Sequence, residues 1–365
     1  MDSVPTDSQT GGCCYAASYW AGLTPVVRVD VKECLGRLDV VRTYHGRRHD
    51  AIAFRFPGSP SDLLELRSVV AVWAVVAAFE GLPVSGPKGL ARLCEILAAA
   101  DLDGPLAAAG AARGTPLNAP PRFVLTTNII GHHNFGRQDV GSLVTEWLQR
   151  EAGWQADPDD YDVNFRVQVF RDVGFLGLQL TGPRTQRHDY RVVNREGSLA
   201  PSIAYCMARM TEPAATDVFM DPMCGAGTLA VERGLGWSVA TLLCGDIAED
   251  AVQAASANLR AAGLDVSAQR WDATDLPLED GSVCKIATNM PYGKDVALKS
   301  PGTFVPALVG EMARVIRPGG RLVVLTAHGR KLLRELARSK AFRAHDPTRL
   351  EHLGFRLSLV TAERR

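Results

Sequence analysis

The sequence has no excess of either charge. Its 365 residues include 40 Lys and Arg and 40 Asp and Glu, so the formal net charge is zero. A protein that coats nucleic acid without specificity needs a strongly basic surface, and this balance argues against that class. A local basic patch on one part of the chain remains compatible with it.

Long apolar runs and closely paired cysteines are also absent. The longest apolar stretch, residues 69–79, is too short for a bilayer, which needs about 20 residues. The N-terminus lacks the basic residue followed by an apolar segment that indicates a signal peptide. No pair among the eight cysteines has CxxC spacing. We therefore expect a cytoplasmic protein with reduced core thiols, no zinc site or other metal, and no membrane contact.

The most informative stretch present is a glycine-rich turn. Residues 221–228 read DPMCGAGT, between an apolar run at 218–220 and a helical pattern at 229–232. Strand, glycine turn and helix form the opening unit of a nucleotide-binding α/β domain, where the helix N-terminus offers free N–H groups. Ala230 replaces the third glycine of the dinucleotide fingerprint, and no Gly-Lys-Ser/Thr follows. A tight structural turn is the alternative interpretation.

Three further apolar runs follow this turn. The run at residues 242–247 has Asp246 near its end. The distance in sequence from the glycine turn to Asp246 is close to that at which an acid meets ribose hydroxyls in doubly wound folds. Residues 283–288 and 321–326 complete a set of four strand-like runs separated by helical patterns. This alternation predicts an α/β domain with a mostly parallel, doubly wound, Rossmann-like sheet. Ligands are then expected at the carboxyl ends of the strands.

Residues 289–292, NMPY, follow the third of these runs. They resemble the [D/N]-P-P-[Y/F] box of methyltransferases that modify exocyclic amines. The side-chain oxygen of Asn289 and the carbonyl of Pro291 can each accept an N–H of a weakly nucleophilic aryl amine, and Tyr292 can stack on an extruded base. Met290 departs from the usual proline but fits the form seen in some RNA guanine-N2 enzymes. A proline turn after a strand is the alternative.

The N-terminal half predicts a smaller α+β region after a loose tail. Helices are expected at 26–38, 90–100 and 138–151, paired strands at 39–44 and 51–56, a helix or helix–strand pair at 63–79, a mobile loop at 104–121, a strand at 122–127 and a hairpin at 162–180. Apolar residues spaced i, i+3 and i+4 carry the 138–151 prediction.

Two segments of this half resemble a THUMP domain. They are residues 124–135 (VLTTNIIGHHNF) and the hairpin at 163–182. The connector that follows, 186–191 (QRHDYR) and 197–208 (GSLAPSIAYCMA), is similar to the one in THUMP-containing class I S-adenosylmethionine-dependent RNA methyltransferases. Together with the glycine turn and the NMPY tetrad, the resemblance covers about residues 20–345.

The resemblance implies a tRNA guanine-N2 methyltransferase that forms N2-methylguanosine. Its THUMP domain and a ferredoxin-like companion would grip the 3′ end of tRNA and place an acceptor-stem guanosine in the active site. Some relatives need a small activator subunit. The implied segments are a flexible tail (1–17), a ferredoxin-like domain (18–85), a THUMP RNA-binding domain (86–183), a linker that closes over the cofactor (184–210) and a Rossmann-like methyltransferase domain (211–365).

The same resemblance assigns roles to individual residues. Those expected to hold S-adenosylmethionine are Leu199, Pro201, Ser202, Asp221, Pro222, Cys224, Gly225, Gly227, Thr228, Asp246, Ile247, Asp272, Ala273 and Asn289. Asn289, Pro291 and Tyr292 are the expected catalytic residues. The basic residues expected to contact RNA are His132, His133, Arg137, Arg184, Arg187, Arg191, Arg195 and Lys294, with a solvated surface as the alternative for each cluster.

Three other functions remain open at this stage. The first is the same chemistry on ribosomal or small nuclear RNA. The second is N6-adenine methylation, which Met290 disfavours. The third is a catalytically weak RNA-binding protein with a degenerate methyltransferase fold that needs a partner subunit.

Overall fold

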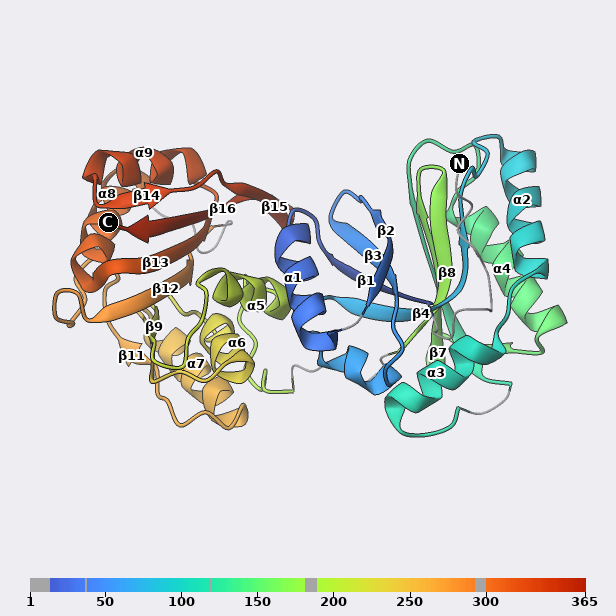
Figure 1. Ribbon diagram of the computed structural model, residues 1–365, viewed down its shortest axis with the longest axis horizontal. Helices are drawn as coiled ribbons and strands as arrows, with labels where there is room; N and C mark the ends of the chain where they lie inside the picture. The colour runs from blue at the N-terminus through green and yellow to red at the C-terminus, as the bar shows by residue number, and fades with distance from the viewer. Residues whose placement is uncertain (1–13, 37, 118–119, 181–188, 293–299) are drawn as a thin grey trace. The chain divides into compact units, whose positions relative to one another are not determined.

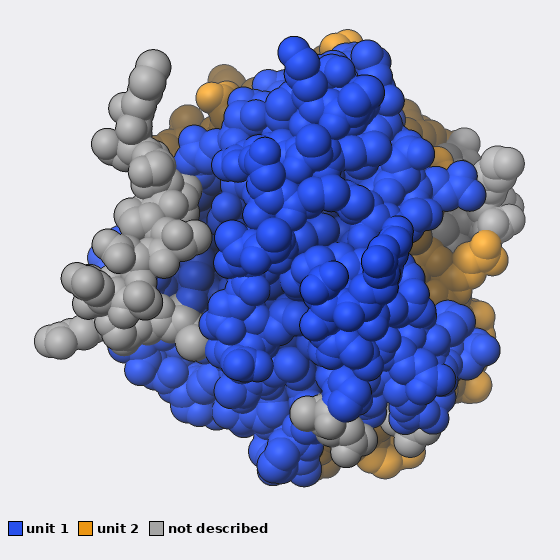
Figure 2. All heavy atoms as spheres, turned by 90° about the vertical axis from the view of Figure 1, so that its right-hand side faces the viewer, with its two compact units in different colours: residues 1–186 blue, residues 187–365 orange. Residues whose placement is uncertain are grey.

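The chain forms two compact units, residues 1–186 (unit 1) and 187–365 (unit 2), coloured separately in Figure 2. The computed structural model describes residues 14–36, 38–117, 120–180, 189–292 and 300–365. The boundary between the units falls inside the linker predicted over 184–210. The two units are described separately below.

Unit 1 is built on one eight-stranded sheet, with strand order β2-β3-β1-β4-β8-β7-β5-β6 (Figure 1). Its elements are β1 (Cys14–Trp20), α1 (Thr24–Leu35), β2 (Asp39–Tyr44), β3 (His49–Arg55), the 3-10 helix η1 (Pro60–Glu65), β4 (Ala71–Phe79), α2 (Gly86–Ala98), α3 (Asp103–Arg113), β5 (Arg122–Ile130), α4 (Arg137–Glu151), β6 (Gln155–Ala156), β7 (Val163–Phe170) and β8 (Val173–Gln179). Because β4 pairs with β8, strands from both segments predicted on either side of residue 85 share this sheet.

Unit 1 corrects two details of the sequence interpretation. Residues 14–17 belong to β1, so the predicted tail 1–17 extends four residues too far. The predicted mobile loop at 104–121 contains α3, whose alanines favour a helix that ends at the left-handed Gly114, with a φ of 68°. The helix–strand pair, one of the two alternatives predicted for 63–79, is confirmed by η1 and β4. The predicted strand pair at 39–44 and 51–56 is confirmed by β2 and β3.

Unit 2 contains a second sheet, with strand order β11-β10-β9-β12-β13-β16-β14, and β15 pairs with β16. Its elements are α5 (Pro201–Met210), β9 (Val218–Asp221), α6 (Thr228–Gly236), β10 (Thr241–Asp246), α7 (Glu249–Ala261), β11 (Gln269–Arg270), β12 (Val283–Asn289), α8 (Pro301–Val315), β13 (Ile316–Thr326), α9 (Gly329–Ser339), β14 (Phe342–Ala344), β15 (Thr348–His352) and β16 (Phe355–Arg364).

The order of these strands sets the position of the site. Strands β10, β9, β12 and β13 are parallel, and β16 runs antiparallel to β13. The chain passes from β9 to β10 on one side and later crosses to β12 on the other, so the strand order reverses beside β9. Ligands bind at such switch points in doubly wound sheets. The predicted mostly parallel α/β fold is confirmed.

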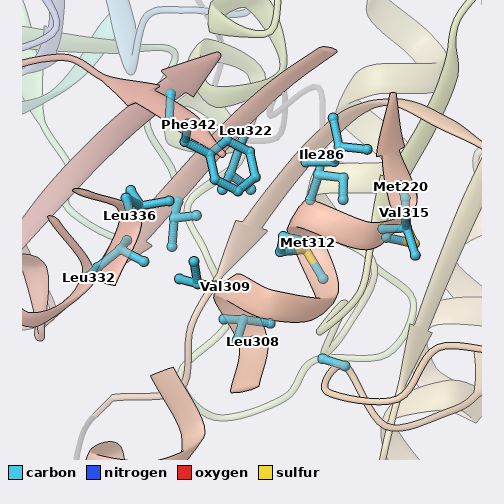
Figure 3. Close-up of a cluster of buried hydrophobic side chains, with 14 of the residues drawn as sticks. Met220, Ile286, Leu308, Val309, Met312, Val315, Leu322, Leu332, Leu336 and Phe342 are labelled. Atoms are coloured by element: carbon cyan, nitrogen blue, oxygen red, sulfur yellow. The ribbon is translucent and has the colours of Figure 1, made fainter. Parts of the chain in front are cut away.

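A buried apolar cluster joins α8 and α9 to this sheet (Figure 3). Met312 and Val309 of α8, Leu332 and Leu336 of α9 and strand residues such as Ile286 belong to this one cluster. Full burial of each such side chain stabilises the fold by about 1.5–3 kcal/mol. The cluster therefore holds the carboxyl strand ends in place.

Unit 2 contains buried thiols in a helix, in its sheet and in the turn after β9. Cys206, Cys224, Cys244 and Cys284 are buried and none of them forms a disulfide, as the sequence predicted for core thiols. Within the described ranges, no cluster of three or more potential metal ligands is present. None of the described helices has the length and apolar character that crossing a membrane requires.

Candidate active site

A cavity of about 330 Å³ lies at the carboxyl ends of β9, β10 and β12. This volume is in the range of small-molecule sites. Its wall consists of the connector before α5, the turn after β9, the ends of β10 and β12 and the first turn of α8. The lining residues are Arg195, Glu196, Gly197, Ser198, Leu199, Asp221, Pro222, Met223, Cys224, Gly225, Ala226, Thr228, Leu229, Asp246, Ile247, Ala248, Asp272, Ala273, Asn289, Pro291 and Phe304.

Most residues predicted to hold the cofactor line this cavity, and three do not. Pro201 and Ser202 are buried at the start of α5, and Gly227 shapes the turn without lining the cavity. The part of the connector that reaches the cavity is therefore residues 195–199, inside the linker predicted over 184–210. Sequence reasoning missed Phe304, whose only signal was an apolar residue at the start of a helical pattern.

The turn after β9 requires its two glycines. Gly225 and Gly227 have φ values of 53° and 77°, in the left-handed region that favours glycine. A Cβ on Gly227 would lie 3.0 Å from the Cβ of Ala255 in α7, so the packing also excludes a side chain there. A Cβ on Gly225 would meet nothing within 4 Å, because this part of the backbone faces open space in the cavity.

Hydrogen bonds fix the same turn to its neighbours. The amide of Cys224 donates to the carbonyl of Gly245 at 2.9 Å, and the indole N–H of Trp271 donates to the carbonyl of Pro222 at 3.0 Å. Helix α6 begins directly after the turn, so its first amides have no acceptor within the helix and carry a partial positive charge. Thr228 and Leu229 of that first turn line the cavity, which suits an anionic ligand group.

Two carboxyl groups beside the turn have different environments. Asp221 is 2% exposed, and burial raises its pKa to about 7; the charge of Asp246 adds to the shift, while Thr288 and the Met223 amide oppose it. Asp246 is less buried, and its two oxygens accept from the amides of Gly225 at 2.9 Å and Ala248 at 3.1 Å. Each oxygen retains a lone pair for a ligand hydroxyl. Asp246 is therefore the better placed acceptor.

A buried amide joins the connector to the glycine turn. Asn258 of α7 is 1% exposed. Its Oδ1 accepts from the amide of Val193, and its Nδ2 donates to the carbonyls of Val193 and Ala226, all at 2.9 Å. Sequence reasoning missed this residue. Its only signal was a polar residue on the apolar face of a predicted helix.

Two arginines predicted to contact RNA interact with the wall of the cavity. The Nη2 of Arg191 donates to the carbonyl of Leu199 at 2.8 Å and to the hydroxyl of Thr228 at 3.4 Å. Arg195 lines the cavity and forms an ion pair with Asp250. These contacts connect both side chains to the cavity wall, and their predicted contact with RNA stays a prediction.

The other predicted RNA contacts are in unit 1 or outside the described residues. His132, between β5 and α4, and Arg137, the first residue of α4, are exposed. His133 packs on Phe135 with ring centroids 4.7 Å apart. Arg184, Arg187 and Lys294 lie outside the described residues. The RNA-binding role of all six remains untested by the structure.

The tetrad at the end of β12 places one acceptor at the cavity. Asn289 lines the cavity, and its Oδ1 is buried without a hydrogen-bond partner among the described residues. An unpaired buried oxygen costs about 1–3 kcal/mol, which an N–H donor on a ligand would recover. Pro291 also lines the cavity.

Met290 has a structural reason to differ from proline. Its amide donates to the carbonyl of Leu325 in β13 at 2.9 Å, a bond that proline cannot form. Its side chain is fully buried in the cluster beneath α8. The departure from the double-proline motif therefore belongs to the core and leaves the positions of Asn289 and Pro291 at the cavity.

Tyr292 does not line the cavity. Its hydroxyl lies 2.8 Å from Nδ1 of His352, and its ring meets Phe355 edge-on at 5.7 Å. Burial lowers the pKa of His352 to about 4, with a further contribution from Arg191, so the imidazole is neutral at pH 7 and shares a hydrogen bond with the Tyr292 hydroxyl. Burial raises the pKa of Tyr292 to about 12. These contacts brace Tyr292, and its predicted stacking on a base stays a prediction.

The switch-point cavity, the glycine turn of β9 and the acid of β10 are the arrangement of a class I methyltransferase fold. Comparison with known proteins agrees. Residues 188–354 match the family model described as "RMKL-like, methyltransferase domain", so unit 2 carries a methyltransferase domain of this kind and the resemblance expected from the sequence is confirmed there.

Individual relatives extend this result. The mouse tRNA (guanine(6)-N(2))-methyltransferase THUMP3 is 33% identical over 227 residues, which are 56% of this chain and 44% of that protein. The mouse U6 snRNA (guanine-N(2))-methyltransferase THUMPD2 is 30% identical over 190 residues, 52% of this chain and 35% of that protein. The chain thus spans less than half the length of these relatives.

A solved structure resembles the whole chain. The crystal structure of TrmN from Thermus thermophilus has a TM-score of 0.78 with 23% identity, covering 96% of this chain and 99% of that one. At this identity the likeness establishes the fold. It covers unit 1 as well as unit 2.

Proposed function

We propose that the protein transfers a methyl group from S-adenosylmethionine to the exocyclic N2 amine of a guanosine in tRNA, giving N2-methylguanosine. The observation that carries the proposal is Asn289, whose buried Oδ1 lies at a cavity beside a methyltransferase-type glycine turn without a partner among the described residues. An acceptor in that position suits an N–H donor such as an aryl amine.

The cavity residues fit the cofactor. The open backbone at Gly225 and the amides at the start of α6 would hold its methionine carboxylate. Asp246, oriented by the Gly225 and Ala248 amides, would accept the ribose hydroxyls. Asp272 and Ala273 line the cavity where the adenine is expected. When bound, the cofactor supplies a methyl group on a sulfonium, which is already activated for transfer.

The chain itself supplies alignment. The Oδ1 of Asn289 and the carbonyl of Pro291 would each accept one N–H of the amine, which directs the nitrogen lone pair and stabilises the positive charge that develops on nitrogen. A strong base is unnecessary, because the proton can leave after transfer. Bracing of Tyr292 by His352 keeps the segment after Asn289 in place.

The choice of RNA rests on the relatives. The name of THUMP3 specifies a tRNA guanine, and we propose tRNA as substrate for that reason, with the acceptor stem and 3′ end gripped by unit 1. The name of THUMPD2 specifies U6 snRNA, which makes a small nuclear RNA the second candidate. A cytoplasmic location, expected from the sequence, is part of the proposal. A small activator subunit, which some relatives need, is a candidate partner for this chain.

A methyl-transfer assay tests the proposal. Purified protein is incubated with labelled S-adenosylmethionine and unmodified tRNA or U6 RNA, and the digested nucleosides are identified. N2-methylguanosine in intact tRNA, reduced in tRNA without its 3′ end, is the expected result. Labelling of U6 RNA alone would identify U6 RNA as the substrate in place of tRNA. Formation of N6-methyladenosine would contradict the assigned chemistry. Absence of cofactor binding by calorimetry would indicate a degenerate domain.

A further inference from the structure

The hairpin of β15 and β16 has an unusual tip. The two strands pair up to His352 and Phe355, so Leu353 and Gly354 alone form the turn. Their φ values are 51° and 81°. Two-residue turns with two left-handed positions strongly favour Asn-Gly, and a bulky leucine in this region is strained. An asparagine would suit the turn better than Leu353.

Burial does not explain the leucine. Its side chain is 58% exposed, and that of Phe355, directly after the turn, is 37% exposed. The tip therefore combines backbone strain with two large apolar side chains in water. Strained residues and exposed apolar groups of this kind are typical of contact sites.

The tip lies on the same edge of the sheet as the cavity. Pairing between β13 and β16 ends at Thr326 and Ser358, so residues 355–357 extend beyond the carboxyl end of β13. The parallel neighbour β12 ends at that edge with Asn289, which lines the cavity. The hairpin thus projects past the strand ends that form the site.

Direct contacts fasten the hairpin to the tetrad. The hydroxyl of Tyr292 bonds to His352 at 2.8 Å, and the Tyr292 ring lies edge-on to Phe355. Tyr292 immediately follows Pro291, which lines the cavity. Because His352 and Phe355 flank the two turn residues, the position of the tip is coupled to that of the tetrad.

The charge of the hairpin favours a nucleotide over an apolar protein surface. Arg349 and Arg356 are exposed on its two strands, and the stretch in which β15 and β16 pair, residues 348–359, contains one acidic residue, Glu351. Apolar or aromatic side chains beside arginines are the usual combination for contacting a base and its phosphate. We infer that Leu353 and Phe355 pack against the base next to the target guanosine in the RNA, with the arginines near its phosphates. This inference rests on the proposed function.

The substitution Leu353→Asn tests it with little risk to folding, because asparagine suits the turn. The melting temperature should stay the same or rise, and S-adenosylmethionine affinity should not change. The KM for unmodified tRNA should rise at least about fivefold, as expected when a leucine side chain no longer buries apolar surface against the base. Phe355→Leu, which keeps an apolar contact with Tyr292, should raise the same KM. Leu235→Asn, at a leucine 40% exposed near the end of α6, is the matched control and should change nothing.

Three outcomes would overturn the inference. One is a KM within twofold of wild type for both hairpin variants. Another is the same rise in the Leu235→Asn control. The third is loss of binding to a protein subunit while RNA affinity is retained, which would make the tip a protein-docking surface.

Failure of the proposed function would look different, because wild-type protein itself would then transfer no methyl group to guanosine. In that case fluorescence anisotropy with labelled tRNA compares RNA affinity of wild type and Leu353→Asn directly. A weaker Kd for the variant supports the contact, and an equal Kd overturns it.

Discussion

The side chain of Asn258 pairs with both the amide and the carbonyl of Val193, each at 2.9 Å, as a neighbouring strand would. Its Nδ2 also donates to the carbonyl of Ala226 in the glycine turn. One buried amide therefore joins three segments: α7, the connector that reaches the cavity and the turn after β9. The relationship predicts that cofactor affinity depends on a residue that does not line the cavity.

Substitution of Asn258 should weaken cofactor binding more than catalysis. Asn258→Asp cannot donate to Val193 and Ala226, and leaving the buried carbonyl of Ala226 unpaired costs about 1–3 kcal/mol. We expect the Kd for S-adenosylmethionine by calorimetry to rise about tenfold or more, with kcat at saturating cofactor within about threefold of wild type. The control is Asp250→Asn, which weakens the exposed ion pair with Arg195 and should change the same Kd by less than about twofold. Equal effects of the two variants on the Kd would contradict the role given to the hydrogen bonds of Asn258.

Asn289 and Asp246 should separate catalysis from cofactor binding. Asn289→Ala removes the acceptor proposed for the amine, so kcat should fall about 100-fold or more while the cofactor Kd changes little. Asp246→Ala removes the acceptor proposed for ribose, so the Kd should rise while kcat at saturation is less affected. Single-turnover kinetics and calorimetry measure both quantities. If both variants lost cofactor affinity equally, the division of roles would be wrong.

Asp221 should make the protein less stable as pH rises. Burial raises its folded-state pKa to about 7, well above the ordinary value of 3.8, so the folded state holds an extra proton between these values. Stability contributed by this group is therefore lost from about pH 4 to pH 7. Asp221→Asn removes that dependence, and the melting temperature of wild type relative to the variant should fall over this window. A constant difference across the window would refute the assigned environment.

His352 should have the opposite effect at acid pH. Its folded-state pKa is lowered to about 4 from 6.5, chiefly by burial, so the unfolded state binds the extra proton between these values. Its contribution to stability therefore increases as pH rises from about 4 to 6.5. Thermal unfolding of His352→Gln should show a smaller loss of stability on acidification than wild type. Identical acid profiles would show that the imidazole titrates normally.

Restoring the double-proline motif should damage this protein. Met290→Pro removes the hydrogen bond from the residue 290 amide to the carbonyl of Leu325. It also leaves a space in the core cluster, so the unfolding free energy should fall by roughly 3 kcal/mol or more. Met290→Leu keeps the amide and most of the volume and should cost less than about 1.5 kcal/mol. Chemical denaturation of the two variants compares them directly. A stable proline variant would mean that the Leu325 bond is dispensable.

The class of the C-terminal domain could be predicted from the sequence alone. The glycine turn, the acid that ends β10 and the NMPY tetrad are local patterns whose spacing follows from strand and helix lengths, so their meeting at one sheet edge could be predicted. Eleven of the fourteen predicted cofactor residues line the cavity for that reason. The sequence interpretation was wrong at α3, where the Gly and Pro residues indicated a loop although the alanines favour a helix.

The distant side chains that complete the site could be identified only in the folded protein. Asn258 reads as one polar residue in a helix until Val193, 65 residues away in the chain, lies against it. Arg191 and Arg195 read as a basic run until the connector folds onto α6 and α7. The pairing of β4 with β8 likewise joins segments that the sequence separates. Such contacts depend on how helices and strands pack together, and no local propensity or spacing encodes that packing.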